Sequence, residues 1–260
     1  MALNPRVLLT PHFPALVADD QAGRGGSIQA GLRELGRTFQ AEGVEVMVIL
    51  SAVWEEEGPF QIDSGARHKS LQDMVGVDVD FHIVCDGWPD LASALQENGL
   101  ASGLPVETVH RGMDHGASVP YSFLFGESGC RVVVLSNSIR APEQFILWGK
   151  VVRETCAGAG AECALMVGSS LSYDEAAFSR DQDLPGGVEL DRIILSRLEA
   201  GDWEGLAGWP VEPGRAAPQA GLRQLAFLQG VLGETTKGRV LAFQHHPSIG
   251  SVLVEFTLPV

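Results

Sequence analysis

The chain has few cysteines and few basic residues for its length of 260 residues. Its four cysteines, at positions 85, 130, 156 and 163, form no C-x-x-C pair, which argues against a zinc knuckle or a redox dithiol. We interpret them as buried structural thiols in a reducing compartment. With 18 Lys and Arg against 33 Asp and Glu, the net charge is −15, which repels phosphate backbones and anionic membrane surfaces. We therefore expect neither nucleic acid nor a membrane as a partner.

Long apolar runs and two common functional loops are also missing. No stretch of about 18 apolar residues occurs, and Pro11 ends the first apolar run after too few residues for a secretory signal. This predicts a cytoplasmic protein. The glycine-rich segment 23–27 matches neither phosphate-binding template, and segment 168–172 lacks the second glycine of a nucleophile elbow. Phosphate binding and serine hydrolysis therefore have little support.

The sequence does contain short β-rich runs that alternate with helical patterns. Such alternation predicts an α/β fold, a single domain over residues 1–260 with a central, largely parallel or mixed sheet covered by helices on both faces. The expected strands are 6–10, 45–50, 79–84, 131–136, 163–168, 239–243 and 252–258. The expected helices are one that begins near Ser27, then 90–97, 142–157, 189–200 and 219–232, with loops at 183–187 and 208–218.

His12 directly follows the first expected strand and lies between Pro11 and Pro14. Ligands of α/β sheets collect at the carboxyl ends of the strands, so this histidine is placed where sites usually form. The alternative is a histidine hydrogen-bonded within a turn, and its position alone does not decide between the two.

Asp114, His115 and Gly116 form a second candidate segment, between Gly112 and Pro120. A carboxylate beside an imidazole can orient it and raise its basicity, and the flanking glycines let a substrate approach the backbone. The alternative is an aspartate turn beside a surface histidine. We expect this segment to be a loop that leads into the apolar residues 121–125.

Three segments, in this order along the chain, resemble the class III extradiol ring-cleavage dioxygenases, which include catechol-, protocatechuate-, DOPA- and aminophenol-cleaving enzymes. Thr-Pro-His12-Phe-Pro is similar to the opening strand-end histidine of that family. Arg-Gly-Met-Asp-His115-Gly resembles its central D-H-G segment, and Val-Leu-Val-Glu255-Phe its terminal strand. The resemblance implies a 2-His-1-carboxylate Fe(II) site with His12 and Glu255 as ligands, and a small aromatic substrate bound beside dioxygen.

The chain departs from the family pattern at two positions. The family's second histidine ligand precedes a tryptophan, and here Val53 precedes Trp54. Valine cannot bind iron. The family's acid/base histidine corresponds to Tyr173, and a phenol with an ordinary pKa of about 10 is a poor base near neutrality. The resemblance therefore assigns acid/base and positioning roles to His115, Asp114 and Tyr173.

Other residues offer partial compensation for the missing ligand. His245 and His246 end an expected strand, and we assign His246 as the candidate that completes the metal shell, with an exposed or hydrogen-bonded histidine pair as the alternative. Glu255 lies on the more polar face of its strand, where it either faces water or needs a partner. We assign no role to His68, in a loop-like segment, to His82, inside an expected strand, or to His110.

The leading functional hypothesis is an Fe(II)-dependent extradiol dioxygenase that opens a catecholic or aminophenolic ring. The alternative is a catalytically silent, metal-free homologue that serves as a structural or regulatory subunit or as a small-molecule-binding module. A third hypothesis keeps the site for a different metal or reaction. The resemblance also implies a homo-oligomer or a pairing with a homologous subunit.

Overall fold

A mixed sheet of eight strands forms the centre of the computed structural model, which describes residues 6–74, 77–126, 129–178, 180–207, 223–246 and 248–258. The strand order is β6-β3-β7-β2-β8-β1-β10-β9. These strands are β1 (Arg6–Thr10), β2 (Val46–Glu56), β3 (Phe60–Asp63), β6 (Val106–Val109), β7 (Arg131–Ser138), β8 (Cys163–Gly168), β9 (Gly238–His246) and β10 (Ile249–Phe256). The four central strands β7, β2, β8 and β1 are parallel, whereas β10 is antiparallel to both β1 and β9. A separate two-stranded sheet joins β4 (Arg67–Lys69) to β5 (Val84–Asp86).

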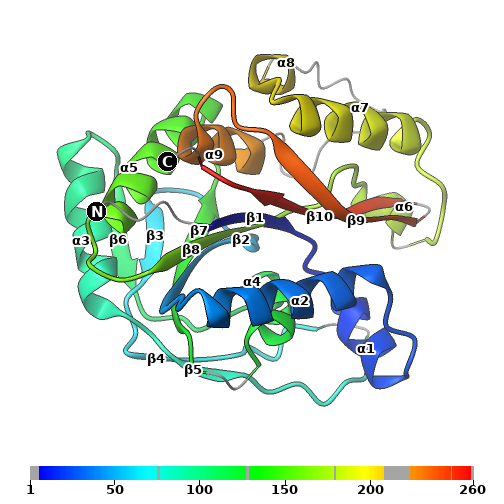
Figure 1. Cartoon of the computed structure of the whole chain (residues 1–260), viewed down its shortest axis with the longest axis horizontal. Helices are drawn as coiled ribbons and strands as arrows, with labels where there is room; N and C mark the ends of the chain where they lie inside the picture. Colours follow the sequence, from blue (N-terminus) through cyan, green and yellow to red (C-terminus); the bar gives the residue numbers. More distant parts are fainter. Residues whose placement is uncertain are drawn as a thin grey trace.

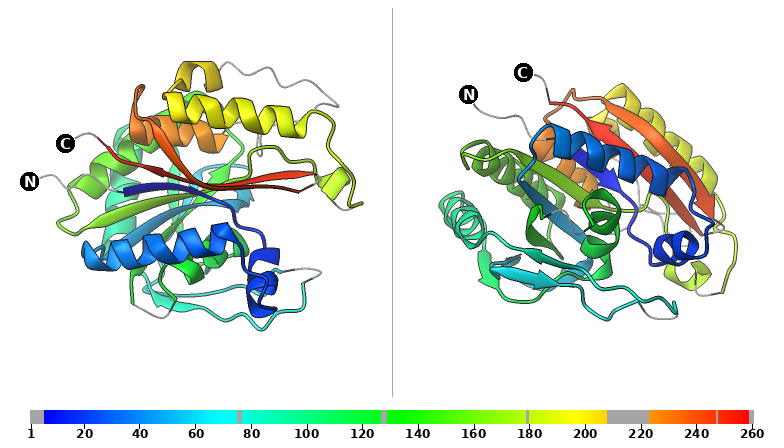
Figure 2. Two further views of the ribbon diagram at one scale, coloured as in Figure 1. Left: turned by 45° about the vertical axis from the view of Figure 1, so that its right-hand side comes forward. Right: turned by 60° about the horizontal axis from the view of Figure 1, so that its bottom comes forward.

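Helices cover both faces of the sheet, as predicted for this α/β fold. In Figure 1, α2 and α4 lie below the sheet and α5, α7, α8 and α9 lie above it, and Figure 2 shows the same layers from two other directions. The lower layer contains α1 (Ala15–Gln21), α2 (Ser27–Ala41) and α4 (His115–Leu124). The other helices are α3 (Pro89–Ala101), α5 (Pro142–Ala157), α6 (Glu175–Phe178), α7 (Gly187–Ala200), α8 (Trp203–Ala207) and α9 (Arg223–Leu232).

Alternate residues of the buried strands supply two hydrophobic cores, one on each face. Val7 and Leu9 of β1 face the core under α3, α5, α7, α8 and α9, whereas Leu8 faces the core under α1, α2 and α4. This alternation follows from the two-residue period of a strand. Because both faces are covered, the central strands are apolar almost throughout, which is why their sequences could be recognised.

Most expected strands and helices are confirmed, but the strand at 79–84 is wrong. Val79, Phe81 and Ile83 do pack against the lower core, while His82 is exposed. The alternating pattern was therefore real, but residues 79–83 form no strand, and only Val84 enters β5. The alternation reflects an extended segment that covers the core without joining a sheet.

The segment after Asp114 is also different from the expected loop. It forms α4, which contains Pro120. Proline at this point lies in the first two turns of a short helix that packs against α2 and β2, and this packing outweighs the cost of the missing N–H. The expected loop 208–218 and the first residues of the expected helix 219–232 lie outside the described residues.

No helix within the described ranges combines the length and the apolar character needed to cross a membrane. The carboxyl ends of β1 and β8 and the β9–β10 turn lie at one edge of the sheet. Three contacts between neighbouring strand ends show this: Ser169 N–H donates to Thr10 O, Leu171 N–H donates to Gly250 O, and Tyr173 pairs with Ile249. This edge contains most of the residues predicted to form the site.

Candidate functional site

His12 follows β1 at this edge and is almost completely buried, with 2% of its surface exposed. Burial and, to a smaller extent, charge repulsion from the neighbouring His115 together lower the pKa of His12 to about 3. The ring is therefore neutral at pH 7. Its Nδ1 atom is buried and has no hydrogen-bond partner. A buried, unpartnered ring nitrogen is costly, so this side chain is not explained by a hydrogen-bonded turn.

His115 lies beside His12. The two ring centroids are 6.1 Å apart and the rings are inclined by 24°. His115 is the first residue of α4, and its side chain keeps 19% of its surface exposed. It is therefore the more accessible of the two imidazoles. We call His12, His115 and the aspartate that holds His115 the histidine site.

Asp73 holds His115 through two contacts. Its Oδ2 atom lies 3.0 Å from Nδ1 of the ring and also accepts the backbone N–H of His115 at 3.0 Å. Burial opposes ionisation of Asp73, but these hydrogen bonds together hold its pKa below the ordinary value. An ionised carboxylate only accepts, so Nδ1 of His115 carries the proton and Nε2 of the neutral ring is left as a base. Sequence reasoning missed Asp73, because nothing in its local sequence marks it.

Asp114 does not orient His115, and the prediction that it does is corrected here. It is the N-cap of α4 and accepts the N–H of Ala117 at 3.2 Å. Its carboxylate also accepts Ser51 Oγ–H at 2.7 Å and the guanidinium of Arg111 at 2.6 Å. Consecutive residues at a helix start point in different directions, so Asp114 faces the sheet while His115 faces Asp73. Asp114 therefore caps α4 and holds the start of this helix against Ser51 of β2.

Gly116 brings α4 against the strands of the site. A Cβ atom at this position would lie 2.5 Å from Ser51 Oγ and 3.0 Å from Val53 Cγ2. Only glycine permits this approach. Val53, which stands at the position of the family's second histidine ligand, thus lies next to the D-H-G segment, with its Cγ2 methyl group close to Gly116.

Aromatic side chains extend from His12 towards Tyr173. Phe13 stacks on His12 with centroids 4.7 Å apart, and Phe178 lies 6.2 Å from Phe13. The ring of Tyr173 lies 6.2 Å from Phe178 as well. Phe178 belongs to α6, beside the ends of β9 and β10 in Figure 1, and half of its surface is exposed. The site therefore has a partly open aromatic border on the side of Tyr173.

Glu255 lies far along the sheet from His12, and the prediction that the two converge is wrong. Because β10 is antiparallel to β1, Glu255 pairs with Leu8 in the middle of β1 and its carboxylate contacts Arg6 at the start of that strand, whereas His12 follows its end. The Glu255 carboxylate is 5% exposed and accepts a hydrogen bond from Arg6 at 3.0 Å and another from Arg239. The partners that the buried Glu255 carboxylate requires are thus two arginines, Arg6 and Arg239.

The two histidines at the end of β9 point to different surroundings. His246 is exposed and pairs through its backbone with Ile249. His245 Nδ1 lies 2.7 Å from the buried carboxylate of Asp191 in α7, and its ring borders a surface pocket of about 480 Å³. His246 therefore joins no group of metal-binding side chains among the described residues.

The described residues differ from the three-donor iron centre that the resemblance implies. A 2-His-1-carboxylate centre needs three side chains aimed at one point. Across the described ranges, no three His, Cys, Asp or Glu side chains are grouped so that they could hold a metal ion. Val53 offers no donor atom, and Glu255 is held by arginines. The described residues therefore do not fit this centre.

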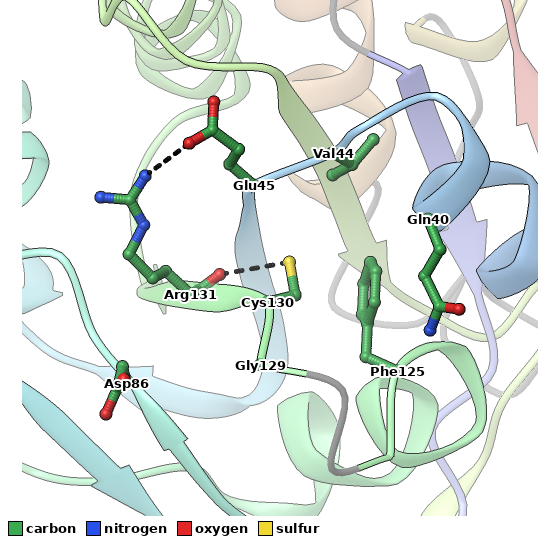
Figure 3. A pocket seen from close by; sticks show the side chains of 8 residues that line it. All are labelled: Gln40, Val44, Glu45, Asp86, Phe125, Gly129, Cys130 and Arg131. Atoms are coloured by element: carbon green, nitrogen blue, oxygen red, sulfur yellow. Dashed lines mark hydrogen bonds and ion pairs between the residues drawn. The ribbon is translucent and has the colours of Figure 1, made fainter.

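A separate pocket of about 520 Å³ opens where β2 and β7 begin, at the opposite end from His12 (Figure 3). In Figure 3, the Arg131 guanidinium and the Glu45 carboxylate form an ion pair, 3.3 Å apart, at one side of the pocket. Its lining residues are Gln40, Val44, Glu45, Asp86, Phe125, Gly129, Cys130 and Arg131. None of the predicted site residues is among them.

Comparison with known proteins identifies the family. Residues 6–254 match the family described as the catalytic LigB subunit of aromatic ring-opening dioxygenase. The chain belongs to this LigB family. The match spans His12, the D-H-G segment and Tyr173, in agreement with the resemblance seen in the sequence, and supports a dioxygenase-type oxidoreductase fold.

A solved structure of the uncharacterized protein JW3007 from Escherichia coli K12 has a similar fold. It superposes with a TM-score of 0.68 at 14% sequence identity and covers 97% of this chain and 100% of its own. At this identity the likeness shows the fold alone. Among curated proteins, none matches the chain.

Proposed function

We propose that this LigB-family protein binds a small catechol- or aminophenol-type compound at the histidine site, with His115 accepting the proton or hydrogen bond of a ring hydroxyl. The observation that carries the proposal is the pairing of His115 with Asp73, 3.0 Å away, beside the buried and neutral His12. Asp73 fixes the tautomer that leaves Nε2 free to accept, which is the arrangement a general base requires.

The surroundings of His115 favour an aromatic ligand. Phe13, Phe178 and Tyr173 border the site, and offset or edge contacts between aromatic rings stabilise binding by about 0.5–1.5 kcal/mol per pair. A phenolic hydroxyl offers His115 a donor at one end of such a ring. Because His12 is neutral at pH 7, it adds no positive charge that would oppose protonation of His115.

The proposal is tested by calorimetric titration of the protein with catechol and with 2-aminophenol in the presence of EDTA. We expect saturable one-to-one binding that weakens at least about tenfold in His115→Ala, since the hydrogen bond becomes one between charged groups when His115 accepts the proton, and such a bond contributes about 1.5–3 kcal/mol. The control variant is His82→Ala, because the side chain of His82 is 72% exposed and outside the site. The control ligand is 1,2-dimethoxybenzene, which lacks the donor. Equal affinity in His115→Ala and wild type would refute the proposal.

Iron-dependent ring opening is the second candidate function, and the match to the ring-opening dioxygenase family favours it. It would require Fe(II) and dioxygen with a catecholic or aminophenolic substrate. Oxygen uptake after anaerobic addition of Fe(II) separates the two candidates. We expect no uptake above the rate of free Fe(II). Uptake that disappears in His12→Ala would replace our proposal with this one.

We also propose that the protein acts as a homo-oligomer or together with a homologous subunit. Support comes from the family description, which names a catalytic subunit and thus a multi-subunit enzyme. Light scattering coupled to size-exclusion chromatography gives the mass of the particle directly. A 27.7 kDa monomer at micromolar concentration, with no change on adding a homologous chain, would contradict this part of the proposal.

A further inference from the structure

Asp63, at the end of β3, is a buried carboxylate that no part of the proposed chemistry uses. Its Oδ2 atom accepts the backbone N–H of Gly112 at 2.6 Å and that of Arg111 at 3.2 Å. Its Oδ1 atom accepts the N–H of Gly65 at 2.9 Å. Asp63 thus binds the backbone of the loop that leads into Asp114 and His115.

His68 of β4 lies behind this carboxylate. Its Nδ1 atom is 3.1 Å from Asp63 Oδ2, and both side chains are 1% exposed. Its Nε2 atom is buried without a partner. A protonated ring would carry a buried N–H at Nε2 without a hydrogen-bond acceptor. The geometry therefore favours a neutral ring whose Nδ1–H donates to Asp63. Burial opposes ionisation of Asp63, but the hydrogen bonds from His68, Gly112 and Gly65 lower its pKa to about 2.

The segment that follows Asp63 stays beside the same loop as far as Asp73. Met113 N–H donates to Lys69 O at 2.9 Å, and Leu71 N–H donates to Met113 O at 2.7 Å. Gly112, the residue before Met113, has a φ of +102°, and a Cβ atom at Gly112 would lie 2.9 Å from Lys69 O. The loop is therefore held along its length, by Asp63 at its start and by Asp73 at His115.

We infer that Asp63, with His68 behind it, is a positioning residue that sets the direction in which His115 presents its base. The inference rests on the proposed function. Asp63 touches neither His115 nor His12 among the hydrogen bonds of the described residues, and acts through the backbone of Arg111 and Gly112. Two Asp–His pairs thus hold the segment 111–115. Asp73 binds His115 in the site, and Asp63, with His68, binds the backbone of the residues just before it.

The experiment compares Asp63→Asn with a matched variant, Asp191→Asn. Asp191 is also a buried carboxylate that binds a histidine ring, His245, and a backbone N–H, that of Ser172, but in α7 on the other face of the sheet. Two readouts are measured: the nitrogen-15 NMR signature of the Nδ1–H tautomer of His115, and the catechol affinity. Thermal unfolding gives the loss of stability in each variant.

We expect both variants to melt at lower temperatures, but only Asp63→Asn to mix the His115 tautomers and to weaken catechol binding about tenfold. Unchanged His115 signals in folded Asp63→Asn would overturn the inference, as would the same changes in Asp191→Asn. If Asp63→Asn does not fold, His68→Leu replaces it, and we expect its catechol affinity to be about threefold lower than that of wild type. His68→Gln keeps a hydrogen-bond donor and should therefore restore the wild-type nitrogen-15 signature of His115. If wild type binds no catechol, the proposed function fails, whereas the NMR signature still decides whether Asp63 positions His115.

Discussion

Removing His12 should flatten the dependence of stability on pH, because the fold keeps this side chain neutral. Its pKa is about 3 in the native protein, against 6.5 for the free side chain. A histidine with a lowered native pKa contributes stability that is complete above the unfolded pKa and is lost as the pH falls towards the native value. The loss therefore begins near pH 6.5 and continues towards pH 3.

The size of the effect follows from linkage. Between pH 6.5 and pH 4.5 the unfolded chain holds from about one half to nearly one proton at His12, whereas the native chain holds almost none. At about 1.4 kcal/mol per pH unit at full uptake, wild type should lose about 2 kcal/mol more than His12→Gln over this interval. Asp63 and Asp73 have lowered pKa values, so their contributions are lost mainly below pH 4 and do not distort the comparison.

The assay is urea-induced unfolding at both pH values for wild type, His12→Gln and the exposed control His82→Gln. The constant cost of placing glutamine in the site cancels when the two pH values are subtracted. We expect the control to follow wild type and His12→Gln to show the smaller loss. Parallel losses in wild type and His12→Gln would refute the argument that His12 is buried and neutral.

Three further substitutions test other parts of the account. Glu255→Gln should lower the free energy of unfolding by about 1–2 kcal/mol, because Arg6 and Arg239 lose the buried carboxylate that pairs with them. Its catechol affinity should be unchanged, and a loss of affinity would mean that Glu255 reaches the site. Gly116→Ala should destabilise the protein by about 1–3 kcal/mol in urea unfolding, since its Cβ would lie 2.5 Å from Ser51 Oγ, and an unchanged midpoint would contradict that packing. Tyr173→Phe should retain most of the affinity for catechol and Tyr173→Ala should not, if the ring rather than the hydroxyl borders the ligand; calorimetry distinguishes the two.

The sequence was sufficient to predict the central layers of the fold. β1, β8 and α5 were predicted with their observed bounds, because continuous apolar runs and a helical period between breakers leave few alternatives. Short elements such as β4 and α8 contain too few residues to show a period. The error at 79–84 has a different cause, since Val79, Phe81 and Ile83 alternate as in a strand but pack without pairing.

Part of the candidate site was accessible from sequence for a related reason. His12 follows a recognisable strand, and His115 stands in a D-H-G segment that resembles a known family, so both were found. Asp73 contacts His115, and Asp63 contacts the loop before it, only through tertiary contacts across 42 and 49 positions of the chain, which no local pattern records. Glu255 was misplaced because its strand is antiparallel to β1, a direction that the sequence of a strand does not reveal.

The central claim is that the histidine site binds a phenolic ligand without a firmly held iron ion. The most direct test is elemental analysis after anaerobic incubation with Fe(II) and removal of loosely bound ion, followed by catechol titration of the same sample. We expect iron well below one ion per chain and a catechol affinity equal to that measured in EDTA. Near-stoichiometric iron that is lost in His12→Ala, together with catechol binding that requires it, would contradict the account.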